Sequence, residues 1–289
     1  AFQVDLDRVK VSATRTDKVP NTSPTAASSG TDLNGMAALD ACEKIKQRLV
    51  EFAAETYGVS ADSVRFENNQ VHVGEQQFGW AEFVQQAYMA RVSLSSNGFY
   101  STPKIHYDRE TGQGRPFLYY ANGAACAEVV VDTLTGEYKT MRVDILHDVG
   151  QSLNPAVDIG QIEGGFVQGM GWLTTEELVY SDEGRLLSNG PATYKIPAVS
   201  DAPPDFRVAL LPHSPNREAT VFRSKAVGEP PLMLGMAVWS ALRDAVSSVA
   251  DYRYSPPLDT PATPERVLQA VTATERWVAA QGEPSCKNA

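Results

Sequence analysis

The sequence is poor in the residues that usually hold metal ions. Its 289 residues include three cysteines and four histidines, and no two cysteines form a CxxC pair. Zinc and iron–sulfur sites need such ligands at short, regular spacings, so we expect this chain to ligate neither. Cys42 and Cys126 lie in apolar surroundings in the sequence and are expected to be buried thiols in a reducing compartment, whereas Cys286 lies in a polar tail.

Basic residues and long apolar runs are also scarce. Lys and Arg number 25 against 35 Asp and Glu, a formal net charge of -10, which argues against a nucleic-acid surface. No apolar run reaches the length of a membrane-spanning helix, and Ala1–Asp7 lacks the basic and apolar regions of a signal peptide. We expect a soluble cytoplasmic protein. The chain begins without Met, and we expect it to be a fragment of a larger subunit.

One stretch, Ser224–Pro231, fixes a single carboxylate beside stiff residues. Glu229 follows Gly228, whose backbone can adopt unusual angles and admit a bulky ligand. It precedes two prolines, the first of which disfavours helical geometry at Glu229. A carboxylate held in this way suits a general base. The alternative is a loop Glu before the helix expected over Leu232–Val249, where it favours the helix dipole. The residues alone leave both alternatives open.

A second candidate is the loop of small and hydroxyl-bearing residues over Thr25–Thr31. Small side chains leave backbone N–H groups exposed, and successive amides ahead of a helix N-terminus form an anion-binding nest. Such a loop would suit a phosphate or a pterin. By composition alone, a plain surface loop is the simpler interpretation.

Hydrophobic periodicity predicts a mixed α+β fold, with packed helices and mixed sheets. The glycines of one helical run, Gln161–Leu178, suggest close approach to a neighbour or ligand. Helices are expected at Met36–Phe52, Phe78–Leu94, Gln161–Leu178, Leu232–Val249 and from Pro264 on, with Thr263 as N-cap. Strands are expected at Val9–Thr14, Val64–Phe66, Gln70–Gly74, Phe117–Tyr120, Ala125–Val131, Lys139–Leu146 and Phe206–Leu211.

The segment SKAVGEPPL, which contains Glu229, closely resembles the active-site segment of the molybdenum hydroxylases of the xanthine dehydrogenase family. In that family the glutamate is the catalytic base. It takes a proton from a hydroxyl bound to molybdenum, and the oxygen attacks an electron-poor ring carbon. The resemblance covers nearly the whole chain, and Ala53–Gly79 is a region that is longer than in some relatives. Further similar segments are Arg91–Ser95, Gly98–Pro103, Ser152–Ala156, Gly190–Pro197 and Asp259–Glu265.

The resemblance implies a set of cofactor contacts. The loop that begins at Pro20 matches the one that wraps the molybdenum cofactor, and Ala27 matches a position beside the metal, through its backbone only. Gln161 matches a cofactor-contacting glutamine, whose amide both donates and accepts hydrogen bonds; the alternative is an ordinary polar residue near a helix N-terminus. The positions expected around the cofactor are Ala27, Ser28, Ser29, Gly30, Thr31, Gln161 and Gly228.

The surrounding polar residues are expected to have lesser roles. Lys225 could lower the pKa of Glu229, but we expect it instead to orient toward the neighbouring chain. Asp148 is interpreted as a turn or capping residue.

The resemblance further implies the C-terminal part of the molybdenum-cofactor-binding subunit. Residues 1–280 would form this region, as one unit or as two closely packed α+β subdomains with Glu229 at their cleft, and residues 281–289 a flexible tail. The complete enzyme would convert hypoxanthine and xanthine to urate with oxygen from water. Molybdopterin would bind to the subunit that contains this chain, and iron–sulfur clusters and FAD would be carried on other domains or subunits. NAD would be the electron acceptor, and the complete enzyme would be a homodimer.

The resemblance also limits what this chain does alone. The purine-clamping residues and one cofactor-contacting element belong upstream in the family, so the N-terminal half of the molybdenum subunit is an expected partner. We expect the isolated chain to be inactive and to bind no cofactor. Two alternatives remain: an aldehyde oxidase or other aromatic-heterocycle hydroxylase, which shares the glutamate turn, and a purely structural assembly module.

Overall fold

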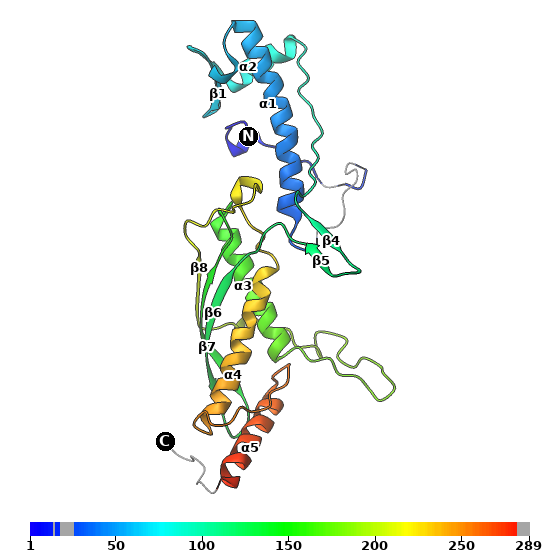
Figure 1. The fold of residues 1–289 in the computed structure, drawn as a ribbon, viewed down its shortest axis with the longest axis vertical. Coiled ribbons are helices and arrows are strands. Elements are labelled where there is room, and N and C mark those ends of the chain that lie inside the picture. The colour runs from blue at the N-terminus through cyan, green and yellow to red at the C-terminus, as the bar shows by residue number, and fades with distance from the viewer. Residues whose placement is uncertain (14, 18–25, 282–289) are drawn as a thin grey trace. The chain divides into compact units, whose positions relative to one another are not determined.

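The chain folds into two compact units, residues 1–118 and residues 119–289 (Figure 1). The computed structural model describes residues 1–13, 15–17 and 26–281. Both units combine helices with small sheets, so the predicted α+β class is confirmed. Most of the expected tail, including Cys286, lies outside the described residues.

The first unit is organised around one long helix. Helix α1 (Met36–Tyr57) continues from a π-helical turn, η2 (Thr31–Gly35), and ends at Gly58, whose φ of 65° provides a left-handed C-cap. A three-stranded antiparallel sheet packs its buried side chains against α1 and α2. The remaining elements are β1 (Val64–Glu67), β2 (Gln70–Val73), β3 (Gln76–Gly79), α2 (Trp80–Met89), β4 (His106–Asp108) and β5 (Gln113–Arg115), with short helices η1 (Leu6–Arg8) and η3 (Ala61–Ser63).

The strands expected over Val64–Phe66 and Gln70–Gly74 are confirmed and pair as a hairpin, but their neighbours differ from expectation. Strands β1 and β2 pair in the register Val64↔Val73. A third strand, β3, includes Phe78 and Gly79, which the pattern assigns to the start of a helix; that helix, α2, runs from Trp80 to Met89 instead of from Phe78 to Leu94. The strand expected over Val9–Thr14 is wrong for residues 9–13, which have no regular structure. Alternation does not make a strand without a partner strand.

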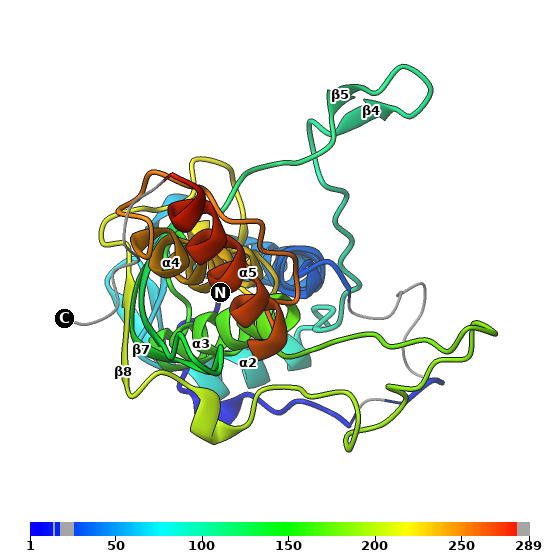
Figure 2. The same ribbon diagram turned by 90° about the horizontal axis from the view of Figure 1, so that it is seen from below.

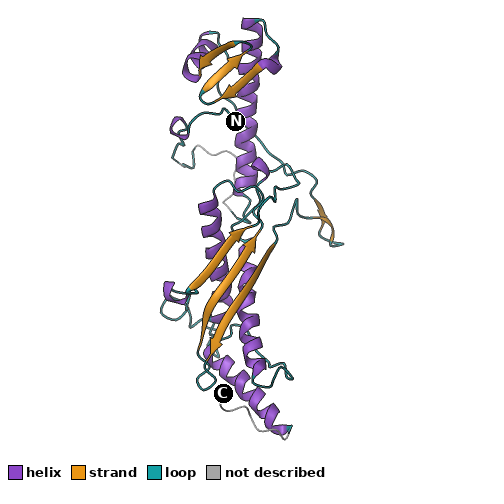
Figure 3. Cartoon of the chain, turned by 90° about the vertical axis from the view of Figure 1, so that its left-hand side faces the viewer, coloured by secondary structure: helices purple, strands orange, loops and turns teal. Residues whose placement is uncertain are grey.

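The second unit is a three-stranded sheet with helices on one face (Figure 3). Strand β6 (Gly123–Val131) pairs antiparallel with β7 (Tyr138–His147), and β8 (Asp205–Leu210) pairs parallel with β7. Figure 2 views this sheet along its strands, with helices α3 (Pro155–Thr174) and α4 (Met236–Ser248) to one side. Helix α5 (Pro264–Ala280) packs against α4.

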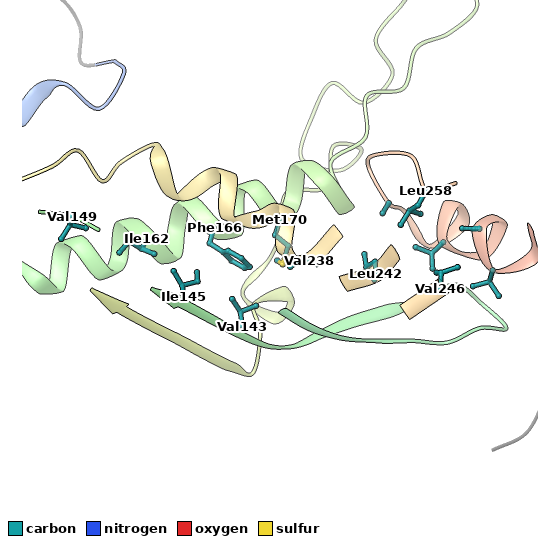
Figure 4. Close-up of a cluster of buried hydrophobic side chains, with 14 residues drawn as sticks. Val143, Ile145, Val149, Ile162, Phe166, Met170, Val238, Leu242, Val246 and Leu258 are labelled. Carbon is teal, nitrogen blue, oxygen red and sulfur yellow. The ribbon is translucent and has the colours of Figure 1, made fainter. Parts of the chain in front are cut away.

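The core of the second unit lies between the sheet and these helices. Val143 and Ile145 alternate with outward-facing residues along β7 and point at Ile162 and Phe166 of α3 (Figure 4). Full burial of each such side chain contributes about 1.5–3 kcal/mol. Helix α4 adds residues at four-residue spacing, which is one helix face: Val238, Leu242 and Val246.

Several boundaries in this unit correct the sequence expectations. Residues 117–120 form no strand, and Cys126 is exposed on β6 rather than buried; Cys42, in the first unit, is half-buried. The helix expected from Leu232 begins two residues earlier as the 3₁₀ helix η6 (Pro230–Gly235) and continues as α4. The predicted N-cap of α5 is confirmed, since the Thr263 side chain accepts from Arg266 N. Short helices η4 (Val199–Asp201) and η5 (Val221–Arg223) complete the unit.

Candidate active site

The segment that leads to Glu229 is paired with the chain that follows β7. Lys225 N donates to Val149 O at 2.8 Å, and Gln151 N donates to Arg223 O at 2.9 Å. These bonds form an isolated antiparallel bridge between Gly150 and Ser224. The backbone four residues before Glu229 is therefore held to the chain that directly follows β7.

A buried ion pair reinforces this pairing. The Lys225 ammonium group contacts the Asp148 carboxylate, and the two side chains are 12% and 4% exposed. Asp148 Oδ1 also accepts from Gly150 N at 2.9 Å and from Ser214 Oγ at 3.1 Å, and Lys225 Nζ donates to Tyr120 O at 3.0 Å. Burial alone would raise the pKa of Asp148, but the hydrogen bonds led by that from Lys225 outweigh it and lower the pKa.

This arrangement was not predicted from the sequence. The two partners are 77 residues apart, and no motif joins them. Asp148 is a buried charge partner rather than only a turn residue, and Lys225 pairs with it inside the second unit. We call the ion pair and its hydrogen-bonding partners the Asp148–Lys225 anchor.

A second contact holds the chain that follows Glu229. Helix η6 packs directly on the glycine face of α3. A β-carbon at Gly169 would lie 2.0 Å from Leu232 O, and one at Gly165 would lie 3.6 Å from Gly228 O. The prediction of close approach is thus confirmed for Gly165 and Gly169, whose neighbour is the segment that contains Glu229, but not for Gly164, where a β-carbon would meet no atom within 4 Å.

Glu229 lies between these two contacts with its side chain exposed. Its φ and ψ of -99° and -34° are helical, although the following proline was expected to disfavour helical geometry there. Gly228 is not among the described glycines with positive φ. Glu229 occupies the N-cap position of η6 but makes no side-chain capping bond.

Gln161 lies on the same helix face as the glycines that contact η6. It is exposed and precedes Gly165 by four residues, about one helical turn. Helix α3 begins at Pro155 after the N-cap Asn154, so Gln161 lies beyond the first turn and is not a helix-terminal residue. The fold thus brings the Gln161 turn of α3 next to the segment of Gly228 and Glu229.

The small-residue loop forms a tight turn in the first unit. Ala27 and Ser28 have φ of 58° and 51°, and Ser29 Oγ donates to Ala26 O at 3.0 Å. Leu33 N donates to Ser29 O at 2.9 Å, so the helix begins directly after the turn. The first amides of a helix have no carbonyl partner within it. We call residues 26–30 the small-residue turn; Thr25 lies outside the described residues.

These features fit a bound anionic pterin group. The turn has only small side chains, and it leads into a helix N-terminus, where amides and the helix dipole favour an anion. Ala27 and Thr31 are exposed, while Ser28, Ser29 and Gly30 are half-buried. The loop therefore offers mainly its backbone to a ligand.

The predicted site residues belong to both units. Glu229, Gly228 and Gln161 belong to the second unit, and the small-residue turn with Thr31 lies in the first. The placement of Glu229 in a cleft between subdomains stays a prediction.

The described part of the chain offers neither a cluster of metal ligands nor a membrane-spanning helix. Within residues 1–13, 15–17 and 26–281, no three or more His, Cys, Asp or Glu side chains gather as a possible metal site. Among the helices of that same part of the chain, none combines the length and apolar character needed to cross a membrane.

Comparison with known proteins identifies the first part of the chain directly. Residues 1–203 match the molybdopterin cofactor-binding domain family. Residues Ser224–Pro231, which we call the Glu229 segment, lie beyond this match, but they are included in two longer sequence matches. The chain is 44% identical to the xanthine dehydrogenase/oxidase of Mus musculus over 100% of its length, and 46% identical to the xanthine dehydrogenase of Dictyostelium discoideum over 92%.

A solved structure shares the fold. Quinoline 2-oxidoreductase from Pseudomonas putida 86 superimposes with a TM-score of 0.72 and 25% identity, over 86% of this chain and 30% of that chain. The present chain spans only 21% of the Mus musculus relative and 19% of the Dictyostelium discoideum relative. It therefore corresponds to one part of a much larger enzyme.

Proposed function

Because the chain belongs to the family of molybdopterin cofactor-binding domains, we propose that it is the C-terminal part of the molybdenum subunit of a xanthine dehydrogenase. In this proposal the complete enzyme hydroxylates hypoxanthine and xanthine to urate with oxygen from water. Glu229 is the general base. The observation that carries this role is the exposed Glu229 carboxylate, held between the Asp148–Lys225 anchor and the η6–α3 contact.

Glu229 performs the proton transfer of the reaction. The molybdenum cofactor, when bound, supplies the two-electron redox chemistry. Glu229 accepts, on a carboxylate oxygen, the proton of the water-derived hydroxyl that attacks the purine carbon. A base held on rigid elements stays within hydrogen-bond reach of that proton, which is the first requirement of general base catalysis.

The cofactor contacts in this proposal come from both units. Amides of Ala27, Ser28, Ser29, Gly30 and Thr31 bind the cofactor, with Ala27 nearest the metal. The Gln161 amide donates to and accepts from the pterin edge. Gly228, beside the base, allows the cofactor to come close.

The remaining parts of the proposal concern the complete enzyme. Iron–sulfur clusters and FAD on other domains or subunits pass the electrons to NAD, within a cytoplasmic homodimer. The N-terminal half of the molybdenum subunit supplies the purine-binding side chains. The isolated chain, which spans about a fifth of its relatives, is therefore inactive and binds no cofactor. Steady-state urate formation by the isolated chain would contradict this part.

Glu229→Gln in the complete enzyme tests the general base. The amide keeps the shape of the side chain but does not accept the proton, so kcat for xanthine should fall about 10²- to 10⁴-fold, with molybdenum content per subunit unchanged. A purely structural Glu229 predicts loss of assembly and of molybdenum instead. Glu265→Gln is the matched control, since Glu265 is also an exposed carboxylate at a helix start, and its kcat should equal that of the wild type.

The substrate class needs a separate measurement. The 44% identity to a xanthine dehydrogenase/oxidase, against 25% to the quinoline enzyme, favours a purine. The value of kcat/KM should be highest for xanthine or hypoxanthine among a panel that includes quinoline and an aromatic aldehyde. A higher value for the aldehyde or for quinoline would favour the alternative, an aldehyde oxidase or another heterocycle hydroxylase.

A further inference from the structure

We propose that Asp148 and Lys225 are positioning residues for Glu229. They contact neither substrate nor cofactor in this proposal; they act through the backbone that leads to the base. The inference rests on the proposed role of Glu229 as general base.

The location of the ion pair supports this role. Lys225 precedes Glu229 by four residues in the same segment, and Asp148 directly follows β7. Their contact is backed by backbone pairing, because Lys225 N donates to Val149 O at 2.8 Å. The next residue is also held, since Ala226 N donates to the Tyr119 hydroxyl at 2.8 Å.

The far side of the segment is fixed as well, so little of the chain remains to absorb a shift. After Ala226, only Val227 and Gly228 precede Glu229, and η6 then packs on the glycine face of α3. Any displacement of the Lys225 backbone must therefore be taken up at or near the base. A misplacement of about 1 Å in a catalytic geometry can reduce a rate by about 100-fold.

Stability alone does not explain why this pair is buried. Desolvating two charges costs free energy that their mutual attraction often fails to exceed, and apolar replacements of such pairs are frequently neutral or stabilising. A buried ammonium group can instead occupy only the few positions in which each of its N–H donors has an acceptor. Here the partners, the Asp148 carboxylate and Tyr120 O, select one position of the segment.

Three variants of the complete enzyme test the proposal: Asp148→Asn, Lys225→Met, and the two combined. Each single change leaves one buried partner uncompensated, so both the unfolding temperature and kcat should fall. The double variant removes both charges, so its unfolding temperature should recover toward that of the wild type. Its kcat should stay at least about tenfold low, with KM for xanthine and molybdenum content preserved.

The outcomes separate positioning from a purely structural role. A double variant that regains both the unfolding temperature and kcat overturns the proposal. Asp205→Asn/Arg207→Met removes an exposed pair of the same unit, whose side chains are 41% and 57% exposed, and should change neither quantity. Glu229→Gln, measured in parallel, tests the premise: an active Glu229→Gln enzyme defeats the general-base role itself, whatever the anchor variants show.

A milder variant covers the case in which the double variant does not fold. Tyr119→Phe removes the oxygen that accepts from Ala226 N without changing any charge. It should lower kcat several-fold at unchanged KM and molybdenum content. An unchanged kcat in Tyr119→Phe would count against the positioning role.

Discussion

The Glu229 segment and the small-residue turn present their chemical groups in opposite ways. Around Glu229 a buried ion pair, side-chain hydrogen bonds and a helix contact fix the backbone on both sides of one exposed carboxylate. In the turn, residues 26–30 carry no charge, and two of them, Ala27 and Ser28, have left-handed backbones. The first region offers a side chain, and the second offers backbone amides.

This difference predicts how each region responds to mutation. A site that works through one side chain loses function when that side chain, or its supports, change. A site that works through backbone amides tolerates changes of side chain but not changes of φ. Both expectations can be tested in the complete enzyme proposed above.

Among substitutions that leave Glu229 itself unchanged, the largest effect is expected from Gly169→Ala, which disturbs the contact between η6 and α3. A β-carbon at this position would lie 2.0 Å from Leu232 O, so η6 must move. We expect a loss of about 1–3 kcal/mol in the free energy of unfolding and about a 100-fold loss in kcat, measured by denaturant unfolding and steady-state kinetics.

Gly164→Ala is the matched control on the same helix. A β-carbon there would meet no atom within 4 Å, so the substitution should stabilise the helix by up to about 1 kcal/mol and leave kcat unchanged. Equal losses of activity in both variants would show that the contact with η6 has no special importance.

The second prediction concerns the backbone of the small-residue turn. Ala27→Val places a β-branched residue at a φ of 58°, which should cost about 1–2 kcal/mol and lower the molybdenum content of the purified enzyme. Ala27→Gly should keep molybdenum content at the level of the wild type, because glycine adopts positive φ readily.

Ala26→Val is the control for this prediction. Ala26 is exposed and is not among the residues with positive φ, so molybdenum content should not change. A normal content in Ala27→Val would remove the turn from the proposed cofactor site.

The same contrast explains what the sequence could predict. Glu229 and its prolines form a contiguous motif. Periodicity placed β7 to within one residue at each end, but it put the start of α3 at Gln161 instead of Pro155 and its end at Leu178 instead of Thr174. The residue types at positions 27 and 28 gave no indication of the left-handed φ of Ala27 and Ser28, because neither residue is a glycine or an asparagine.

Contacts between residues that are far apart in the sequence also could not be predicted from the residue pattern. The ion pair of Asp148 and Lys225 joins residues 77 apart, and the parallel pairing of β8 with β7 joins strands separated by a helix and a long connection. Periodicity describes which face of an element is buried, but it does not say which element covers it.

The third prediction is that acid destabilises the protein through groups next to the Asp148–Lys225 anchor. His147, next to Asp148, is 1% exposed, and burial lowers its pKa below the ordinary value of 6.5. Between the lowered pKa and 6.5 the unfolded chain binds a proton that the folded chain does not, so stability is lost as pH falls through this window. Asp148 acts in the same direction at lower pH, because its pKa is lowered as well.

Denaturant unfolding between about pH 5 and pH 8 measures this effect. Asp148 favours the charged form of His147 and Lys225 opposes it, so both stay unchanged in the test variant, His147→Phe. That variant should lose part of the pH dependence, by about 1.4 kcal/mol for each unit by which burial lowers the pKa. His213→Asn, at an exposed position, should retain the full dependence.

The smallest effects are expected from one substitution made in both regions. Ser224 is buried and its Oγ donates to Val221 O at 2.7 Å, so Ser224→Ala should cost about 1 kcal/mol of unfolding free energy. Ser29 is half-buried, but its Oγ makes a longer, solvent-accessible bond of 3.0 Å to the exposed Ala26, where water can replace the hydroxyl. Ser29→Ala should therefore cost less than about 0.5 kcal/mol. Because Ser224 directly precedes Lys225, only Ser224→Ala should also lower kcat; a larger kinetic loss in Ser29→Ala would reverse the contrast between the two regions.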